Sequence, residues 1–329
     1  MLDLIAKAID KNATDLYLRV GEAPYTRGLD GVRHFDDRVI SDDDMTSLLT
    51  LATGFGDFKG HDLDAGFGIC GRRIRANFYK SLNRISAVLR ILPKNAPDIC
   101  AGYPEILKAS ALKSQGLVLV VGATSSGKST TLAAMLEWIN LNSFKHIITI
   151  EDPVEFVFAS KNSIFTQREI GSDCASYDDG LRAALRQSPD VIMVGEIRDV
   201  ATLKAALNAA ETGHLVLASM HASSAVGAVV KAIAMGGAEE AILRASLAEN
   251  MLAIVYQRLF NGVNGTKEAV FEVLARTNAS VNLIREGNTA ELSASMQISR
   301  EAGSVLFDDA LSMAIKQGRI REDINKTIF

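Results

Sequence analysis

Residues 122–130, with the sequence GATSSGKST, have the types and spacing that most clearly predict chemistry. They fit the pattern G-x-x-x-x-G-K-[ST], and they lie between an apolar run over 117–121, typical of a buried strand, and a predicted helix over 129–142. Glycines let successive backbone N–H groups point at a phosphate group, and the N-terminus of a helix adds partial positive charge. The segment therefore predicts a nucleotide-binding loop, and its flanking elements argue against a chance match.

The side chains of this loop have distinct expected roles. Lys128 is expected to bridge the β- and γ-phosphates of ATP, and the hydroxyl of Ser129 is expected to bind the Mg²⁺ that accompanies them. The loop alone leaves open whether the nucleotide is hydrolysed. The predicted nucleotide-binding residues are Gly122, Thr124, Ser125, Ser126, Gly127, Lys128, Ser129 and Thr130.

A carboxylate after the predicted strand over 191–194 is the first candidate for hydrolysis. Glu196 lies where the second acidic motif of P-loop ATPases ends its strand, and Gly195 takes the place of the usual aspartate. At the carboxyl end of a strand, Glu196 could polarise the attacking water as a general base. Magnesium would then be held by Ser129, phosphate oxygens and waters. The alternative is a solvated glutamate at the end of a strand.

Four further polar residues lie at strand ends. Glu151 and Asp152 should face the same crevice as Glu196, because the carboxyl ends of parallel strands meet at one edge of the sheet. They could order water or magnesium, although Glu-Asp-Pro is also a common exit from a strand. His214 and His221 flank a predicted strand, and His221 closes it near the expected γ-phosphate. A single histidine there is usually only hydrogen-bonded, and the pair does not predict a metal site.

Strands and helices alternate from residue 116 onward. This alternation predicts an α/β unit with a parallel sheet that is covered by helices on both faces. After about residue 225 the chain is rich in Ala, Leu and Ile and is expected to be mostly helical, with a hairpin-like interruption over 262–267. The predicted strands cover 117–121, 146–150, 191–194 and 215–219, and the predicted helices cover 129–142, 177–187 and 201–211.

The first hundred residues follow a different pattern. An amphipathic helix over 1–13 and a helix capped by Ser41 accompany strand-like segments between glycine and polar breaks, which predicts an α+β module with hairpins and one mixed sheet. Three of the six prolines fall within residues 93–104 and mark a linker. The expected organisation is a first domain over 1–97, a linker over 98–115 and a second domain over 116–329.

The composition narrows the class of protein. The 329 residues are 48% hydrophobic with a net charge of −4, which excludes a disordered or collagen-like chain and argues against a general nucleic-acid coat. No run approaches the roughly 18 apolar residues of a membrane-spanning helix, and the N-terminus lacks the apolar core of a signal peptide. The widely spaced Cys70, Cys100 and Cys174 support neither a disulfide framework nor a thiolate zinc site. A cytosolic protein is expected.

Several segments together resemble the secretion ATPase superfamily. In chain order, four of them resemble its Walker A, Asp box, atypical Walker B and His box, and N-terminal strands resemble its PAS-like domain. The resemblance covers nearly the whole chain. It implies an N-terminal PAS-like α+β domain followed by a RecA-like P-loop ATPase domain with a helical C-terminal part. The segments are 122–130, 149–156 (TIEDPVEF), 194–199 (VGEIRD) and 212–225 (TGHLVLASMHASSA), with 13–18, 28–33, 73–78 and 87–93 in the N-terminal part.

Within that superfamily the chain is most similar to the PilT-type retraction ATPases of type IV pili. The PAS-like module stands at the start of the chain, and the four-cysteine zinc insertion of many assembly ATPases is absent after residues 257–259. Residues 279–285 (ASVNLIR) resemble the AIRNLIR element of retraction motors, although Ser280 and Val281 replace Ile and Arg.

The resemblance also implies roles for the candidate acids and histidines. Glu196 would be the catalytic glutamate, and Glu151 with Asp152 would support water and magnesium. His214 and His221 would sense or relay the nucleotide state.

Two arginines of the N-terminal domain enter the predicted site only through the resemblance. Arg75 and Arg90 match arginines that reach the phosphates, where a guanidinium from a mobile domain would stabilise γ-phosphate charge when the cleft closes. Without the resemblance, both would be solvated strand residues. Arg258 is a weaker candidate for the same role.

The resulting hypothesis is a hexameric ATP-hydrolysing motor that drives type IV pilus retraction at the cytoplasmic face of the inner membrane. It would use ATP with Mg²⁺ but no zinc, bind no nucleic acid directly, and act on an inner-membrane pilus platform protein. The alternatives are a pilus-assembly or secretion-system ATPase of the same superfamily, a RecA-like nucleic-acid translocase, and a nucleotide-gated scaffold that has lost hydrolysis because Gly195 replaces the usual acid.

Overall fold

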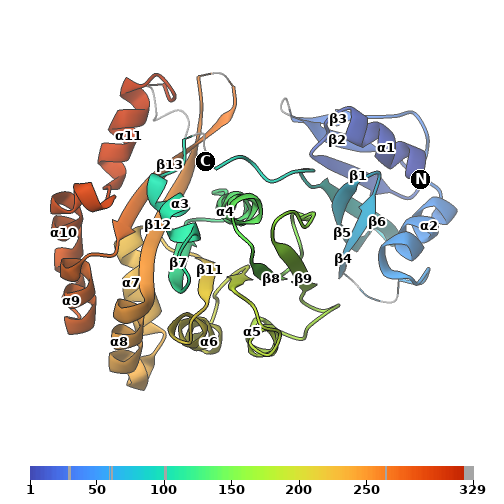
Figure 1. Cartoon of the computed structure of the whole chain (residues 1–329). Helices are drawn as coiled ribbons and strands as arrows, with labels where there is room; N and C mark the ends of the chain where they lie inside the picture. The colour runs from blue at the N-terminus through green and yellow to red at the C-terminus, as the bar shows by residue number, and fades with distance from the viewer. Residues whose placement is uncertain (29–30, 59, 61, 100–101, 264, 322–329) are drawn as a thin grey trace. The chain divides into compact units, whose positions relative to one another are not determined.

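The computed structural model describes residues 1–28, 31–58, 60, 62–99, 102–263 and 265–321. They form two compact units, whose elements are labelled in Figure 1. The first unit comprises Met1–Asn95 and the short segment Pro153–Val157. The second comprises Ala96–Asp152 and the chain from Phe158 onward. The division falls close to residue 97, where the sequence placed the end of the first domain, and Cys100 lies outside the described residues.

The first unit is built on a six-stranded sheet with the strand order β3-β2-β1-β6-β5-β4. Every pairing in it is antiparallel, so the expectation of a mixed sheet was wrong. Most neighbouring strands are also consecutive in the chain and therefore run in opposite directions, and β1 pairs antiparallel with the more distant β6. The strands are β1 (Asp15–Arg19), β2 (Tyr25–Gly28), β3 (Gly31–His34), β4 (Asp62–Ile69), β5 (Arg72–Ser81) and β6 (Arg84–Ile91), and the helices are α1 (Leu2–Asp10) and α2 (Asp42–Thr53).

Both helices of the first unit pack on one face of this sheet. Leu16, Phe78 and Leu89 are fully buried on that face and share a core with α1 and α2. Alternate residues of the same strands point to the other face and are mostly polar, with Val88 as an exception. Ser41 caps α2, as predicted, because its hydroxyl accepts a hydrogen bond from the backbone N–H of Asp44.

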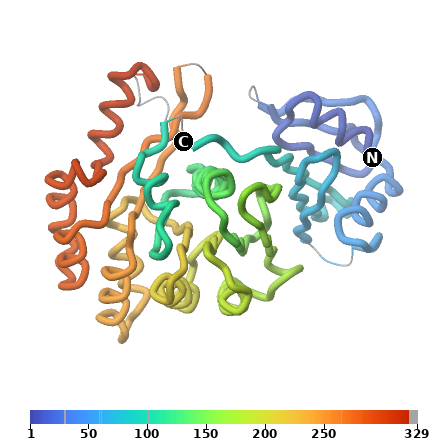
Figure 2. The backbone as a smooth tube through the Cα atoms, in the orientation of Figure 1, coloured from blue at the N-terminus to red at the C-terminus, as the bar shows by residue number. Residues whose placement is uncertain are grey.

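The second unit contains a seven-stranded sheet with the order β13-β12-β7-β11-β10-β8-β9. All strands are parallel except β13, which pairs antiparallel with β12. The backbone trace in Figure 2 shows helices in most of the connections between the parallel strands, whereas β8 and β9 are joined without a helix. The strands are β7 (Gly116–Val121), β8 (His146–Glu151), β9 (Ile164–Glu169), β10 (Val191–Val194), β11 (Leu215–Met220), β12 (Met251–Asn261) and β13 (Lys267–Ala275).

Helices cover both faces of this sheet, which confirms the predicted α/β architecture. Leu117, Leu119 and Val121 of β7 contribute to one core, and Val118 and Val120 contribute to the other. Because such a strand is buried on both sides, it is a continuous apolar run in the sequence. Helices α3 (Glu105–Ala111) and α4 (Lys128–Asn142) share the second core, and the first core includes α5 (Tyr177–Ala184), α6 (Val200–Glu211), α7 (Ala225–Ala234), α8 (Glu240–Asn250), α9 (Asn278–Glu286) and α10 (Leu292–Ile298).

Most of the described residues after 225 are helical, as expected, and the long hairpin of β12 and β13 interrupts these helices. The interruption expected at 262–267 falls at the turn of that hairpin, in which residue 264 lies outside the described residues. One segment of the second unit differs from the sequence expectation. The segment 98–115, expected as a linker, contains α3, whose Leu107 and Ala111 are buried in the core of the second unit.

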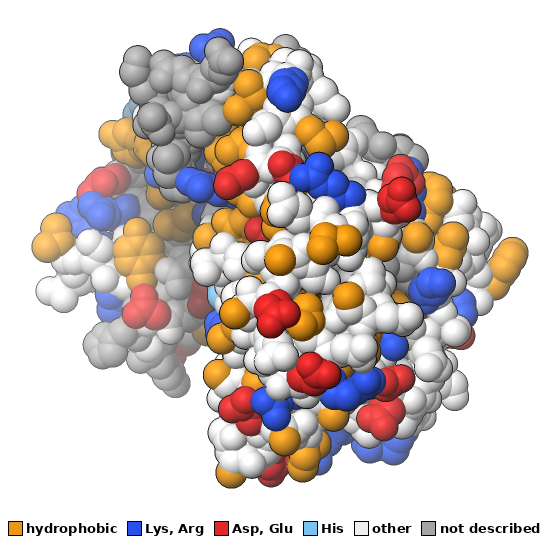
Figure 3. Space-filling view, turned by 90° about the vertical axis from the view of Figure 1, so that its left-hand side faces the viewer, with side chains coloured by type: hydrophobic (Ala, Val, Ile, Leu, Met, Phe, Trp, Pro, Cys, Tyr) orange, Lys and Arg blue, Asp and Glu red, His pale blue; other side chains and the backbone are white. Residues whose placement is uncertain are grey.

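The C-terminal helices present a surface of mixed charge. Figure 3 shows basic, acidic and hydrophobic side chains interspersed on the face that carries them. Several of these charges are paired, including Arg300 with Asp309 of α11 (Phe307–Lys316) at 2.6 Å and Arg285 of α9 with Glu249 of α8 at 3.2 Å. In the part of the chain that the structure describes, no helix is both long enough and apolar enough to cross a membrane.

Candidate functional site

The phosphate loop joins the end of β7 to the start of α4, as predicted. Gly122 has a φ of +156° and Gly127 a φ of +87°, and both values favour glycine. A Cβ atom at Gly122 would lie 2.6 Å from the backbone oxygen of Gln257, and one at Gly127 would lie 3.0 Å from the side-chain nitrogen of the same residue. The loop therefore has glycine at both ends because β12 leaves too little space there for a side chain.

The amine of Lys128 is folded back over this loop. Its Nζ donates hydrogen bonds to the backbone oxygens of Gly122, at 3.1 Å, and Ala123, at 2.8 Å. Ser129 is exposed in the first turn of α4, and Thr124 and Ser125 are exposed in the loop. An ammonium group and the N-terminus of a fifteen-residue helix thus lie at one place, which is a favourable environment for an anion.

Glu196 lies at the carboxyl end of β10 between two basic side chains. Its Oε1 is 3.0 Å from Nε2 of His221, which directly follows β11, and its Oε2 accepts a hydrogen bond of 2.8 Å from Nε of Arg198. Because β10 and β11 pair in parallel, with Val194 opposite Ala218, their carboxyl ends meet. The structure therefore brings together two residues that the sequence had placed at one edge.

Glu151 and Asp152 lie at the end of β8, beside β10. Glu151 is buried and accepts a hydrogen bond of 2.7 Å from the hydroxyl of Thr149. Asp152 is 3.5 Å from a guanidinium nitrogen of Arg198, so this arginine links the carboxylates that follow β8 and β10. The three predicted acids thus lie at neighbouring strand ends as an acidic cluster, and Arg198 is a shared cation for Asp152 and Glu196.

Tyr177 and Arg198 are members of this cluster that the sequence did not single out. Burial raises the pKa of the Tyr177 phenol well above its usual range, and the negative charges of Asp152 and Glu196 raise it further, so the phenol stays protonated. A Cβ atom at Gly195 would lie 3.1 Å from the Tyr177 hydroxyl, which accounts for glycine there. The position of Arg198, two residues after Glu196, could have indicated from the sequence that it lies in the site. Nothing in the sequence around Tyr177, at the start of helix α5, indicates that it does.

The structure separates His214 from the other predicted residues of the second unit. Leu215 is paired with Gly116 and Met220 with Val121, so the phosphate loop lies at the end of β11 that leads to His221. His214 precedes the opposite end of the strand. Its Nδ1 lies 2.9 Å from the backbone oxygen of Ala209, at the C-terminus of α6. Of the two histidines, only His221 follows the carboxyl end of a strand and lies at the edge of the sheet that carries the phosphate loop.

Arg75 and Arg90 belong to the first unit and are cross-strand neighbours on β5 and β6. Both are exposed on the face of the sheet that α1 and α2 leave uncovered. Nε of Arg90 donates a hydrogen bond of 2.9 Å to the buried carboxylate of Asp15 on β1. Their role toward phosphates stays a prediction.

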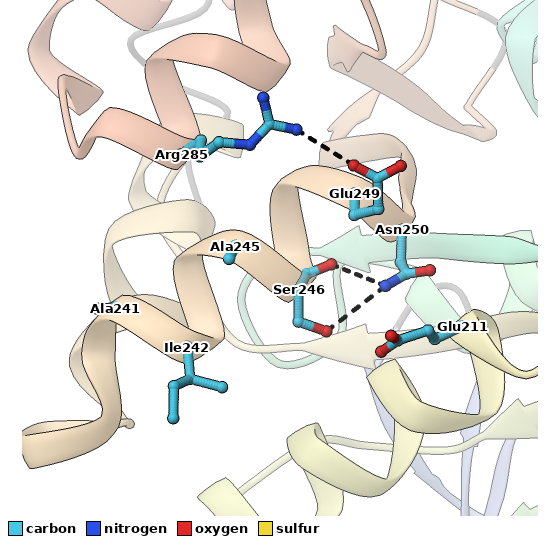
Figure 4. Close-up of a pocket in the computed structure, with 8 residues that line it drawn as sticks. All are labelled: Glu211, Ala241, Ile242, Ala245, Ser246, Glu249, Asn250 and Arg285. Carbon is cyan, nitrogen blue, oxygen red and sulfur yellow. Dashed lines mark hydrogen bonds and ion pairs between the residues drawn. The ribbon is translucent and has the colours of Figure 1, made fainter.

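A cavity of about 590 Å³ lies among α8, α9 and the end of α6, away from the phosphate loop. Figure 4 shows Glu211, Ile242 and Arg285 around it, with Arg285 turned toward Glu249. None of the predicted nucleotide-binding residues lines it, so the nucleotide chemistry is assigned to the phosphate loop. Within the described ranges, no group of three or more His, Cys, Asp or Glu residues could hold a metal ion.

Comparisons with known proteins show what this chain is similar to. A sequence model of the family described as type II/IV secretion system protein matches residues 86–321, which include the phosphate loop and the acidic cluster. The uncharacterized protein YggR of Escherichia coli is 38% identical, over 97% of this chain and 99% of that protein. The type IV pilus retraction ATPase PilT of Pseudomonas aeruginosa is 35% identical, over 98% of this chain and 95% of that protein.

Solved structures give the same result for the fold. A crystal structure of the pilus retraction motor PilT with bound ADP has a TM-score of 0.89 and 34% identity, and the match covers 98% of this chain and 95% of that one. The ATPase DotB of Legionella pneumophila has a TM-score of 0.82 and 26% identity, over 98% of this chain and 93% of that one.

Proposed function

This chain belongs to the family of type II/IV secretion system proteins and is an ATPase, and we propose that it drives the retraction of a type IV pilus. The observation that carries the proposal is its likeness, in sequence and in fold, to a retraction motor over nearly its whole length. The phosphate loop and the acidic cluster supply the chemistry that such a motor needs.

The loop residues fit a nucleotide with its Mg²⁺. We infer that Lys128 exchanges two backbone oxygens for phosphate oxygens when ATP binds, because an ammonium interacts more strongly with an anion than with a neutral carbonyl. The exposed hydroxyl of Ser129, in the first turn of α4, would hold Mg²⁺, which usually keeps several waters and takes few protein ligands. Bound there, the ion would neutralise charge on the phosphates.

Glu196 is the residue proposed to take a proton from the attacking water. Its two oxygens contact His221 and Arg198, and each oxygen keeps a further lone pair that could accept the proton of the water. Both partners are substantially exposed and can move, whereas Glu151 is buried and can hold its position. We propose that Glu151 and Asp152 order water and magnesium beside it.

The assembly and its partner are part of the same proposal. Six copies would form a ring that acts on an inner-membrane platform protein from the cytoplasmic side. Arg75 and Arg90 would reach the phosphates, and His221, which contacts Glu196, would relay the nucleotide state. The support for these roles is the resemblance of the segments that carry them.

A motor for pilus assembly or secretion is the second candidate, and residues 279–285 favour it. Val281 stands where the retraction element has an arginine, and it is buried in the core of the second unit. Ser280 is also buried, and its hydroxyl donates a hydrogen bond of 3.0 Å to the backbone oxygen of Ala275. Both positions serve the packing and capping of α9, so this element lacks the first arginine of AIRNLIR and keeps the second as Arg285.

Pilus counts discriminate between the two candidates. In cells that lack the gene, loss of a retraction motor leaves abundant surface pili, whereas loss of an assembly motor leaves none. Complementation with Glu196→Ala should reproduce the deletion, and complementation with Glu211→Ala, at the separate cavity, should restore the wild-type count. Bald cells after deletion would contradict the retraction proposal and support the assembly motor.

A further inference from the structure

Strand β12 lies directly against the phosphate loop. It pairs in parallel with β7, with Tyr256 opposite Val121, so Gln257 lies level with the first residue of the loop. The backbone of Gln257 limits the space at Gly122, and its side chain limits the space at Gly127. One residue of β12 therefore contacts both ends of the loop.

The side chain of Gln257 also joins the loop to the helix that follows it. Its Nε2 donates a hydrogen bond of 2.6 Å to the backbone oxygen of Ser126, and its Oε1 accepts one of 2.7 Å from the hydroxyl of Thr131. Gln257 and Thr131 are each 1% exposed, so water does not compete for these bonds. The carbonyl of Ser126 can only accept, which requires the NH₂ group of the amide to face it.

The bond to Ser126 has a consequence for the next N–H group. In a planar trans peptide, the carbonyl of one residue and the N–H of the next point in opposite directions. Holding the Ser126 carbonyl toward Gln257 therefore directs the Gly127 N–H away from β12. Backbone N–H groups of such a loop are the groups that bind phosphate oxygens.

We propose that Gln257 is a positioning residue for the nucleotide: its amide fixes the Ser126–Gly127 peptide so that the loop is formed before the nucleotide binds. Thr131 fixes the amide in turn. Neither side chain touches the nucleotide in this proposal. It rests on nucleotide binding at the loop and is independent of which pilus or secretion system the ATPase serves.

The test measures ADP affinity by calorimetry and stability by urea unfolding. Gln257→Glu keeps an acceptor for Thr131 but places a carboxylate oxygen against the Ser126 carbonyl, and it should weaken ADP binding roughly ten- to one-hundredfold. Asn140→Asp is the matched control, because it makes the same amide-to-carboxylate change at a fully buried residue near the other end of α4. It should lower stability and leave ADP affinity within about twofold of wild type.

A double-mutant cycle tests the route through Thr131. Thr131→Val should weaken ADP binding severalfold alone and should have no further effect in a Gln257→Met background, because Thr131 acts through the amide. If Gln257→Glu does not fold, the ADP affinities of Gln257→Met and Thr131→Val are compared with that of Asn140→Asp instead. Wild-type ADP affinity in the folded Gln257 variants would overturn the proposal, as would equal losses in Asn140→Asp. Wild-type protein that does not bind ADP would overturn the nucleotide site itself.

Discussion

Gly127 and Gly171 offer a matched test of why the phosphate loop ends in glycine. Their φ values are +87° and +88°, so alanine at either position meets the same backbone cost. A Cβ atom at Gly171 would have nothing within 4 Å, whereas one at Gly127 would lie 3.0 Å from Nε2 of Gln257 and 3.6 Å from Leu259. The two alanine substitutions therefore have similar backbone strain, but only the new methyl group at residue 127 contacts neighbouring side chains.

The expected losses follow from this difference. Alanine in the left-handed region costs about 1–2 kcal/mol, which is the whole loss expected for Gly171→Ala. Gly127→Ala adds about 1–2 kcal/mol, because Gln257 is buried, held by two hydrogen bonds, and must shift by a few tenths of an ångström. Its free energy of unfolding should therefore fall by about 2–4 kcal/mol, and its ADP affinity by about tenfold or more.

Urea unfolding and ADP calorimetry check both values. Trp138 is the chain's only tryptophan and lies in α4, so its fluorescence reports the second unit, which contains both glycines. Gly171→Ala should bind ADP like the wild type. Equal destabilisation of the two variants, or wild-type ADP affinity in Gly127→Ala, would refute the reasoning that contact with Gln257 requires glycine there.

Three further predictions concern charge. Lys128→Ala should abolish ATP turnover without unfolding the protein, and turnover measured by phosphate release would contradict the assignment of the loop. Arg198→Ala should lower kcat about tenfold with little change in KM, because the carboxylates of Glu196 and Asp152 lose their shared cation; unchanged kcat would show that this cation is dispensable. Burial raises the pKa of Glu272, so its carboxyl group stays protonated to a higher pH in the folded chain than in the unfolded chain. The free energy of unfolding should therefore fall as the pH rises from the ordinary pKa of glutamate to the raised pKa of Glu272. Glu272→Gln should remove that fall in thermal scans from about pH 4 to 8, and an unchanged pH profile would exclude Glu272 as its cause.

The phosphate loop and its neighbouring strands could be predicted because each has a local signal. Lys128 and Ser129 follow a glycine at the required spacing, and the strand before them is apolar at every position because both of its faces are buried. The meeting of Glu196 with His221 also followed from a general rule, since parallel strands place their carboxyl ends at one edge. The same rule places His214 at the opposite edge, because it precedes its strand.

The strands of the hairpin that carries Gln257 could not be predicted in the same way, although the interruption expected at 262–267 marked its turn. Its first strand, β12, lies between β7 and β13, and the buried sequence MLAIVYQRLF has neither the alternation of a half-buried strand nor a turn signal before it. It directly follows helix α8, and its apolar residues also fit the expectation of a mostly helical region after residue 225. The bond from Gln257 to Ser126 joins residues 131 positions apart, and nothing local to either residue indicates it.

The two sides of the proposed site differ in how freely they can rearrange. On the β12 side, Gln257 and Thr131 are almost fully buried, so the geometry that receives the phosphates is set by the core. On the β10 and β11 side, the side chains of Arg198 and His221 are 57% and 41% exposed, and both can release Glu196. We therefore expect the core contacts to set the affinity for nucleotide, and the exposed Arg198 and His221 to control the position of Glu196 toward the water. Substitutions on the first side should change ADP affinity most, and substitutions on the second side should change kcat most.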